Sequence, residues 1–514
     1  MIKNLNMKLF LMALTFFFGG CEDKGTGWTP DMIPDDPVIT PGDDADTEGI
    51  HTYNAPLYWS VYEYCWKLER RNEELVNAGG QGQAIDMSEG SWQNIIGYVA
   101  ENLLPYGYNM ICTDGFMAMD GTSEPDPTGY MTKYGSVKLK KLSEMCKAKG
   151  LKLGVYDNPL WIHGPEETII EGTDNITFKD LRYKQGEDNV LYPDADDGFW
   201  WVVASHKGAE EYIDGFFKYY KNLGVDFIRM DFLCYYENGY DRGMNAIKGK
   251  GYGRENYKLA LQYICKAAKK YGVFTSLVMP NMHEDAALER EYGNMARIVG
   301  DTWSGGWHHV SNSDRGKVFE DWPSCGNMFD GFTHWSKYSG RGKMIMDGDF
   351  IRLNTFGSDA EKESVISLQL MAGGPVAIAD VPGDSFANSD LKFCQNEEML
   401  ALNKDGFAGK PLSDVLNSTN SQIWYGQMTN GDWVIGLFNR EDSKQFRSVK
   451  FSDLGIEGKM KVRDLWKHAD EGEADNLNVE LEAHACKIVS QRFLEAGADW
   501  VVRDIRGVLE LILQ

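Results

Sequence analysis

From about residue 51 onward, short apolar runs alternate with longer stretches in which apolar residues recur every three or four positions. Runs of the first kind predict buried strands, and stretches of the second kind predict amphipathic helices. The predicted strands lie at 56–62, 108–116, 151–159, 225–232, 273–280, 296–303 and 375–383. The predicted helices lie at 92–107, 136–150, 210–224, 256–272, 288–295 and 363–374.

Strands and helices that alternate in this way predict a parallel sheet covered by helices. About eight strand candidates fall within roughly 360 residues, which fits a closed (β/α)8 TIM barrel over residues 51–413. An open, doubly wound sheet is the alternative. It would prefer a glycine-rich phosphate loop after the first strand, and none is present. The barrel is therefore the favoured fold.

The pattern changes after residue 413. "TNGD", at 429–432, lies between two apolar segments and is a hairpin signal. Further short apolar runs with β-branched residues follow it and predict more strands. They lie at 449–456, 460–466 and 485–491. We expect a small C-terminal antiparallel β-sandwich over 414–490, and then a helical tail of unknown role over 491–514.

The N-terminus has the pattern of an export signal. Two lysines precede an apolar stretch at 9–18, and two glycines then precede a lone cysteine, Cys21. This predicts a lipoprotein signal peptide over 1–21 with Cys21 as the lipidated residue; an ordinary signal peptide with a chance cysteine is the alternative. Residues 22–50, rich in Pro, Gly and Asp, predict a disordered acidic linker. We therefore expect a cell-envelope lipoprotein of the outer membrane, on its periplasmic or its surface face.

Charge and cysteine spacing exclude two classes of protein. The formal net charge is −25, which repels polyanions and makes nucleic-acid binding improbable. The nine cysteines form no CxxC pair, so a zinc cluster is not expected. We expect no metal and no cofactor, and a membrane contact through the lipid anchor alone. The oligomeric state stays open.

Polar residues end several of the predicted strands. In a barrel, the C-terminal strand ends meet at one mouth, where active-site residues gather. The strand-end residues are Asp114, Tyr156, Asp157, Arg229, Asp231, Arg297 and Asp301, and the nearby tryptophans are Trp59, Trp161, Trp303 and Trp307. Carboxylates beside aromatic side chains are typical of sugar chemistry. Alternation along the strand places Arg229 and Asp231 on one side, so we expect the cation to lower the pKa of Asp231.

The order of these motifs resembles glycoside hydrolase family 27, the family of α-galactosidases and α-N-acetylgalactosaminidases, over about residues 55–490. The segments that carry the resemblance are "YGYNMICTDGF", "LKKLSEMCKAKGLKLGVYDN", "LGVDFIRMDF", "ARIVGDTW" and "SLQLMAGGPVAIADV". The resemblance implies a retaining exo-α-glycosidase that removes terminal sugars from an oligosaccharide or polysaccharide. It assigns the nucleophile to Asp231 and the acid/base to Asp301, with the two carboxyls about 5–5.5 Å apart.

Sugar recognition is less well defined than the reaction. We expect the substrate to contact Trp59, Asp114, Tyr156, Arg229, Arg297 and Trp303. For Trp59, core packing is the alternative, and for Arg297 it is a structural salt bridge.

Several positions depart from the family pattern. Thr113 stands where the family has the first of two acids, and Phe116 replaces a tryptophan. The Glu or Ser that faces the 2-substituent of the sugar has no counterpart, and Val278 or Met279 is nearest. The resemblance implies an α-galactosidase-like specificity, and the departures leave β-L-arabinopyranose or a bulkier or 2-substituted sugar as the alternative.

Two other functions are compatible with the same residues. One is a glycan-binding lipoprotein without turnover, and the other is a transglycosylase that uses the same aspartates. The presence of both Asp231 and Asp301 favours a hydrolase over a binding protein. His308 and His309 are adjacent and point apart, which makes a poor metal site, so we expect surface or aglycone contacts from them.

Overall fold

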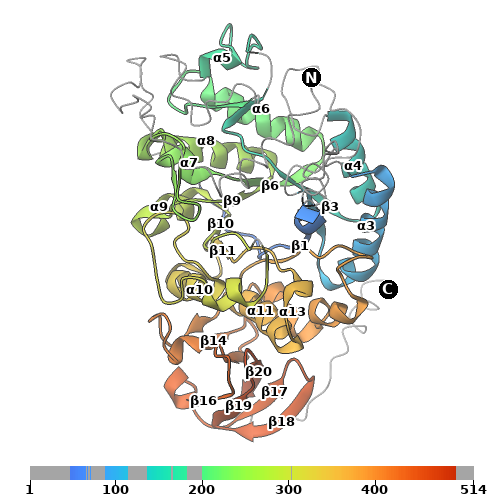
Figure 1. Cartoon of the computed structure of the whole chain (residues 1–514), viewed down its shortest axis with the longest axis vertical. Helices are drawn as coiled ribbons and strands as arrows, with labels where there is room; N and C mark the ends of the chain where they lie inside the picture. The colour runs from blue at the N-terminus through green and yellow to red at the C-terminus, as the bar shows by residue number, and fades with distance from the viewer. Residues whose placement is uncertain are drawn as a thin grey trace, which may run out of the picture.

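A closed parallel barrel forms the larger part of the chain (Figure 1). The structure is a computed structural model that describes residues 47–64, 66–67, 70, 87–113, 136–163, 166–181, 199–302 and 304–493. Its main sheet has the order β11-β10-β9-β6-β3-β2-β1-β12. The strands are β1 (Leu57–Ser60), β2 (Met110–Thr113), β3 (Lys152–Tyr156), β6 (Val225–Met230), β9 (Phe274–Leu277), β10 (Met295–Arg297), β11 (Ile345–Asp347) and β12 (Val376–Ile378).

The two edges of this sheet meet. Ile351, just after β11, forms a parallel bridge with Ile378 of β12. The Ile351 amide donates to Ala377 O at 2.8 Å, and the Ala379 amide donates to Ile351 O at 2.9 Å. The sheet is thus a TIM barrel, and the predicted fold class is confirmed.

Helices surround the barrel as a ring in Figure 1. They begin and end as their sequences dictate: the Ser358 side chain accepts the Glu361 amide at the start of α11, and Gly373, at φ 72°, ends it. The longer helices are α3 (Glu89–Asn102), α4 (Ser136–Ala148), α6 (Ala209–Asn222), α8 (Arg254–Tyr271), α9 (His283–Tyr292), α10 (Met328–Trp335), α11 (Asp359–Ala372) and α13 (Glu397–Asp405). The short ones are α5 (Phe178–Leu181), α7 (Leu233–Glu237) and α12 (Leu391–Cys394).

Two excursions leave the barrel from strand ends. After β3 the chain forms β4 (Trp161–His163), which pairs antiparallel with β5 (Phe199–Trp201). After β6 and α7 it forms the hairpin of β7 (Tyr240–Asp241) and β8 (Ala246–Ile247). Both start where the strands end, so both add residues around the mouth of the barrel.

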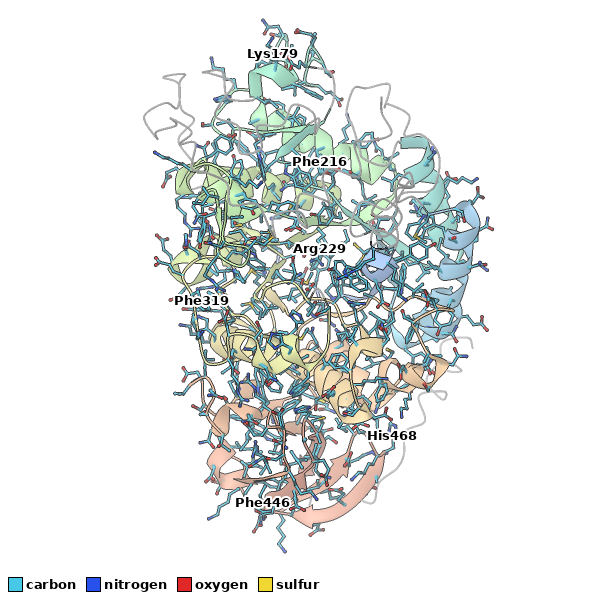
Figure 2. All side chains as sticks on the ribbon, viewed as in Figure 1. Lys179, Phe216, Arg229, Phe319, Phe446 and His468 are labelled. Atoms are coloured by element: carbon cyan, nitrogen blue, oxygen red, sulfur yellow. The ribbon has the colours of Figure 1, made fainter. Side chains whose placement is uncertain are left out.

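The interior of the barrel changes from apolar to charged along its axis. Its apolar part contains Tyr58, Met110, Cys112, Phe227, Met295, Ile345, Phe350, Ala377 and Ala379. Two residues further along β6, β10 and β11, the inward-facing side chains are charged and buried: Arg229, Arg297 and Asp347. The sequence thus places a charged layer directly beneath the strand ends. Arg229 lies near the middle of the barrel in Figure 2.

The C-terminal module is an antiparallel sandwich, as predicted, and lies below the barrel in Figure 1. A six-stranded sheet of order β13-β14-β15-β20-β17-β18 faces the pair β16-β19. Apolar side chains from both sheets, such as Ile435, Val449 and Val489, form one core between them. The strands are β13 (Lys410–Pro411), β14 (Ile423–Gln427), β15 (Trp433–Phe438), β16 (Gln445–Lys450), β17 (Met460–Asp464), β18 (Ala469–Ala474), β19 (Asn476–Leu481) and β20 (Cys486–Phe493).

Three local predictions differ from the structure. The seventh barrel strand, β11, was not predicted, because Met344–Met346 is a short apolar run with no helical pattern directly before it. The predicted strand 449–456 ends at Lys450, and a 3-10 turn at Phe451–Leu454 follows. β20 extends to Phe493, into the range predicted as a helical tail, and residues 494–514 lie outside the described residues.

The tight interior gives a first prediction. A Cβ on Gly154, in β3, would lie 2.9 Å from Phe227 Cδ1 and 3.3 Å from Met110 Sδ. We expect Gly154→Ala to overpack the barrel and lower the free energy of unfolding by about 1–3 kcal/mol. Gly97→Ala is the matched control, because this helical glycine has open space around it, and it should raise stability by about 0.5–1 kcal/mol. Denaturant midpoints measure both, and equal stabilities for the two variants would contradict the packing argument.

Candidate active site

Asp231 directly follows the last residue of β6, and its carboxyl is held from two sides. Tyr156 Oη donates to Oδ2 at 2.8 Å, and the Phe232 amide donates to Oδ1 at 2.7 Å. Asn158 Nδ2 also donates to the backbone oxygen of Asp231 at 2.7 Å. These bonds fix the orientation of the carboxylate at the mouth of the barrel.

The balance of effects on Asp231 differs from the prediction. Burial raises its pKa, while Arg229, the Tyr156 hydroxyl and the Phe232 amide lower it by less. Arg229 lowers the pKa as predicted, but burial outweighs it, so the pKa of Asp231 is raised overall. The sequence did not show that this carboxyl would be partly buried, which disfavours its charged form.

Asp301 lies beyond the end of β10, and 37% of its side chain is exposed. Arg297 Nη2 donates to its Oδ1 at 2.6 Å. Burial raises the pKa of Asp301 to about 6; Arg297 lowers it, and the negative charges of Asp349 and Asp231 raise it. Asp231 thus acts electrostatically on Asp301, so the structure brings the two predicted aspartates to one mouth. Their predicted separation of about 5–5.5 Å stays a prediction.

A buried arginine links Asp301 to a second carboxylate. Arg297 is 0% exposed, and its Nη1 donates to Asp349 Oδ1 while its Nε donates to Val299 O at 3.1 Å. Asp349 Oδ2 in turn accepts the Thr302 amide at 2.7 Å and the Thr302 hydroxyl. Arg229 Nη2 lies 3.6 Å from Asp349 Oδ1. The buried charges are therefore paired, as removal from water demands.

Asp347 and Phe350 complete the floor of the mouth. Asp347 Oδ1 accepts the Asp349 amide at 2.8 Å, whereas its buried Oδ2 has no hydrogen-bond partner within the described part of the chain. The Arg229 guanidinium lies 4.4 Å from the centre of the Phe350 ring. This favourable contact orients the cation.

Strained backbone conformations occur at the mouth of the barrel. Three non-glycine residues that lie one or two positions after a barrel strand have a positive φ. They are Phe232 at 65°, Met279 at 56° and Asp349 at 77°. Such conformations cost about 1–3 kcal/mol each and gather at functional sites. In the described residues they accompany the catalytic candidates rather than the opposite end of the barrel strands.

Sequence reasoning missed three carboxylates here. Asp347 and Asp349 have the same strand-end signal as Asp231, but the apolar run before them was too short to stand out. Asp241, on β7, is buried; burial raises its pKa to about 7, and the charges of Asp301 and Asp231 add to the rise. No strand pattern marks Asp241 in the sequence, so only the structure could find it.

The other predicted site residues lie at the mouth, in the core, or outside the described residues. Tyr156, Arg229 and Arg297 lie at the mouth. Arg297 is 0% exposed and its donors bind Asp301 and Asp349, so the structure shows the salt bridge that was the alternative to a substrate contact.

Trp59 does not lie at the mouth: it is 0% exposed in the wall of the barrel, and its Nε1 donates to Asp380 O at 2.8 Å, so it fills the core. Its neighbours Tyr58 and Ser60 have the inward positions on β1, which places Trp59 on the helix-facing side. Asp114, Trp303 and Cys21 lie outside the described residues.

The position expected to face the 2-substituent is apolar in space as well. Val278 and Met279 are both buried, and their carbonyls accept the amides of Leu233 and Cys234.

Among the described residues, no group of three His, Cys, Asp or Glu side chains could hold a metal ion. None of the described helices is long and apolar enough to cross a bilayer.

Comparisons with known proteins identify the family. Residues 418–490 match the alpha galactosidase C-terminal beta sandwich domain. The isomalto-dextranase of Arthrobacter globiformis is 34% identical over 451 residues, which are 84% of this chain and 66% of that protein. The solved structure of the T6 isomalto-dextranase from this species, complexed with panose, superimposes with a TM-score of 0.76 at 33% identity and covers 88% of this chain and 76% of that one. The chain belongs to glycoside hydrolase family 27.

Other family members are more distant. The α-galactosidase of Oryza sativa subsp. japonica is 25% identical over 279 residues, which are 53% of this chain and 58% of that protein. A family 27 β-L-arabinopyranosidase from Geobacillus stearothermophilus shares the fold, with a TM-score of 0.66 at 19% identity, and covers 88% of this chain and all of that one. The chain spans less than two thirds of the length of the two curated relatives.

The contacts of Asp231 give a second prediction. Tyr156→Phe removes a hydrogen bond that lowers the pKa of Asp231. The pKa should therefore rise, and the acid limb of kcat/KM should move to higher pH. A lost bond to a charged group costs about 1.5–3 kcal/mol, or at least about tenfold in kcat/KM on that limb. The matched control is Tyr257→Phe, whose hydroxyl donates to the buried Glu289 at 2.8 Å away from the mouth; an equal shift in both variants would exclude a specific effect on Asp231.

Proposed function

We propose that this chain is a retaining α-glycosidase in which Asp231 is the nucleophile and Asp301 the acid/base, and that its substrate is an α-linked glucan. The observation that carries the reaction is the placement of the two aspartates at one mouth above a shared, charge-balanced arginine cluster. Support for the substrate comes from the family member that resembles this chain over most of its length.

The contacts are compatible with double displacement. An Asp231 oxygen attacks the anomeric carbon while the protonated Asp301 gives its proton to the glycosidic oxygen, so that the bond to the aglycone breaks. The resulting glycosyl ester on Asp231 is then attacked by a water molecule, whose proton passes to the Asp301 carboxylate. The sugar leaves with retained configuration, and both aspartates return to their first state.

Two observations favour a glucan over galactose. The isomalto-dextranase is 34% identical over 84% of this chain, whereas the rice α-galactosidase is 25% identical over 53%. The T6 isomalto-dextranase binds panose, a trisaccharide of α-linked glucose.

A substrate panel tests this proposal. We expect dextran or panose to yield new reducing ends, and the 4-nitrophenyl α-D-galactoside, β-L-arabinopyranoside and α-N-acetylgalactosaminide to react at least about a hundredfold more slowly, because a site built for one hydroxyl pattern rejects another. Asp231→Asn should abolish turnover with unchanged folding. The control is Asp226→Asn, on the same strand and paired with Lys221 at 2.8 Å.

The outcomes separate the alternatives. Faster release from a galactoside or arabinopyranoside would replace the glucan by that sugar. Sugar binding without release from any substrate would support the non-catalytic binding protein. Longer oligosaccharides at high acceptor concentration would indicate transglycosylation by the same aspartates.

The state of Asp301 predicts the pH dependence. Its pKa is raised to about 6, and the first step needs the protonated form. kcat/KM on dextran should therefore fall as pH rises through about 6. Asp301→Ala should remove this limb and slow substrates with poor leaving groups about 100-fold or more, while glycosyl fluorides, which need no proton, lose far less. A basic limb that survives in Asp301→Ala would assign the proton to another group, with Asp241 the first candidate.

A further inference from the structure

Arg440 follows β15 in the sandwich, but its side chain binds the barrel. It is 1% exposed. Nε donates to Ser311 Oγ at 3.0 Å, and Nη2 donates to Ser311 O at 2.6 Å. The same guanidinium pairs with Asp330 Oδ1 at 2.8 Å and donates to Asn327 Oδ1 at 3.1 Å. Its guanidinium thus forms four hydrogen bonds, to the segment that connects Asp301 to α10 and to Asp330 in the first turn of α10.

Ser311 belongs to an unusual element. Residues His308–Asn312 form a π-helix, which begins shortly after Asp301. Single π-helical turns are rare and occur frequently at functional sites. The turn is closed by the Ser313 amide, which donates to His308 O at 2.8 Å. An external donor to Ser311 O therefore stabilises an element that is weak by itself.

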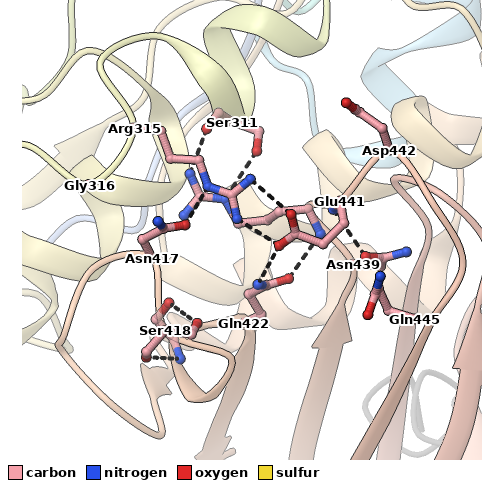
Figure 3. A network of polar contacts seen from close by, with 12 residues as sticks. Ser311, Arg315, Gly316, Asn417, Ser418, Gln422, Asn439, Glu441, Asp442 and Gln445 are labelled. Atoms are coloured by element: carbon pink, nitrogen blue, oxygen red, sulfur yellow. Dashed lines mark hydrogen bonds and ion pairs between the residues drawn. The ribbon is translucent and has the colours of Figure 1, made fainter.

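Further sandwich residues hold the two ends of this element. The Trp307 ring stacks on the His484 ring, with centroids 4.5 Å apart and planes at 22°. Arg315 Nη2 pairs with Glu441 at 2.7 Å, and Arg315 Nε donates to Asn417 Oδ1 at 2.6 Å (Figure 3). Sandwich residues thus contact the segment before, within and after the π-helix.

Residues 304–312 also lie near the charged side chains of Arg297 and Asp349. Ser304 Oγ and His309 Nε2 are 3.5 Å apart. Burial lowers the pKa of His309 to about 4, and Asp349 and Arg297 both act on it electrostatically. His309 is therefore close to Arg297, which holds Asp301, and to Asp349, which binds the same arginine, rather than being a surface contact alone. The Gly305 amide donates to Thr302 O at 2.9 Å, which joins the segment to the residue after Asp301.

We propose that Arg440 is a positioning residue for the acid/base step: the sandwich, through Arg440, holds the π-helix at 308–312 and so fixes the wall of the mouth beside Asp301. The inference rests on the proposed function, because it concerns proton transfer by Asp301. It gives the C-terminal domain a part in catalysis through the loop that carries Asp301.

The test uses Arg440→Lys in the full chain. Lysine keeps the charge for Asp330 but cannot bind Ser311 O and Oγ as a fork. We expect kcat/KM on dextran to fall about tenfold, with less than about a twofold loss on the glycosyl fluoride, since a displaced wall disturbs protonation more than attack. Ser311→Ala, which removes only one acceptor, should show the same selectivity to a smaller degree.

Two control variants separate positioning from folding and docking. Lys487→Gln changes a lysine of the sandwich that pairs with Asp464 at 2.9 Å and Glu471 at 2.6 Å, both within the sandwich. Arg463→Lys changes a sandwich arginine that joins the barrel elsewhere, at Glu398 with 2.7 and 2.8 Å contacts. Neither should alter the ratio of dextran to fluoride activity.

Hydrogen exchange makes the test independent of turnover. Amides of residues 308–313 should exchange at least about tenfold faster in Arg440→Lys than in the wild type and the two controls, because local opening becomes easier. Unchanged exchange in this segment, or equal losses on both substrates with a normal melting temperature, would overturn the proposal. If the wild type hydrolyses nothing, the proposed function fails, and the exchange experiment still decides whether Arg440 orders the π-helix.

Discussion

The Arg297 guanidinium, buried between Asp301 and Asp349, is the interaction on which the mouth of the barrel depends. An unpaired charge at 0% exposure would cost several kcal/mol, so the arginine and its carboxylates must be present together. Arg229 also lies beside Asp349. The floor is therefore nearly neutral as a whole, and the pKa values of the carboxyls above it depend on how far nearby cations and donors offset burial.

The charged and hydrogen-bonding neighbours differ between Asp301 and Asp231. Asp301 shares its arginine with Asp349, so the cation compensates only part of its burial, and its pKa stays near 6. Asp231 receives two hydrogen bonds, from Tyr156 and Phe232, that favour its ionised form. Burial raises the pKa of both carboxyls, but these donors offset part of the rise at Asp231. Different environments for two neighbouring carboxyls support the roles that we propose for them, Asp301 as the acid and Asp231 as the nucleophile.

The sequence predicted what is encoded locally. Arg229 and Asp231 lie two positions apart on one strand, so alternation alone places both at the mouth. Trp59 shows the limit of this reasoning: both faces of a barrel strand are buried, "LYWS" is apolar or small throughout, and the pattern does not tell inside from outside. Asp349 reaches Arg297 only because distant strands are neighbours in the barrel, and the partial burial that outweighs Arg229 in setting the pKa of Asp231 is likewise a property of the assembled fold.

The contact between the domains follows from the length of one loop. After β10 the chain runs from Ile298 to Asn327 before α10 begins, and loops longer than about 12–15 residues are rarely ordered without support. This loop carries Asp301, whose carboxyl must stay within a fraction of an ångström of its working position. The barrel holds the start of the loop through Asp349 and Thr302, while the sandwich holds its middle through Arg440 and His484. A sandwich that only stabilised the fold would not need to bury an arginine against a π-helix in the loop that carries Asp301, and this contact supports our proposal that the two domains act together in catalysis.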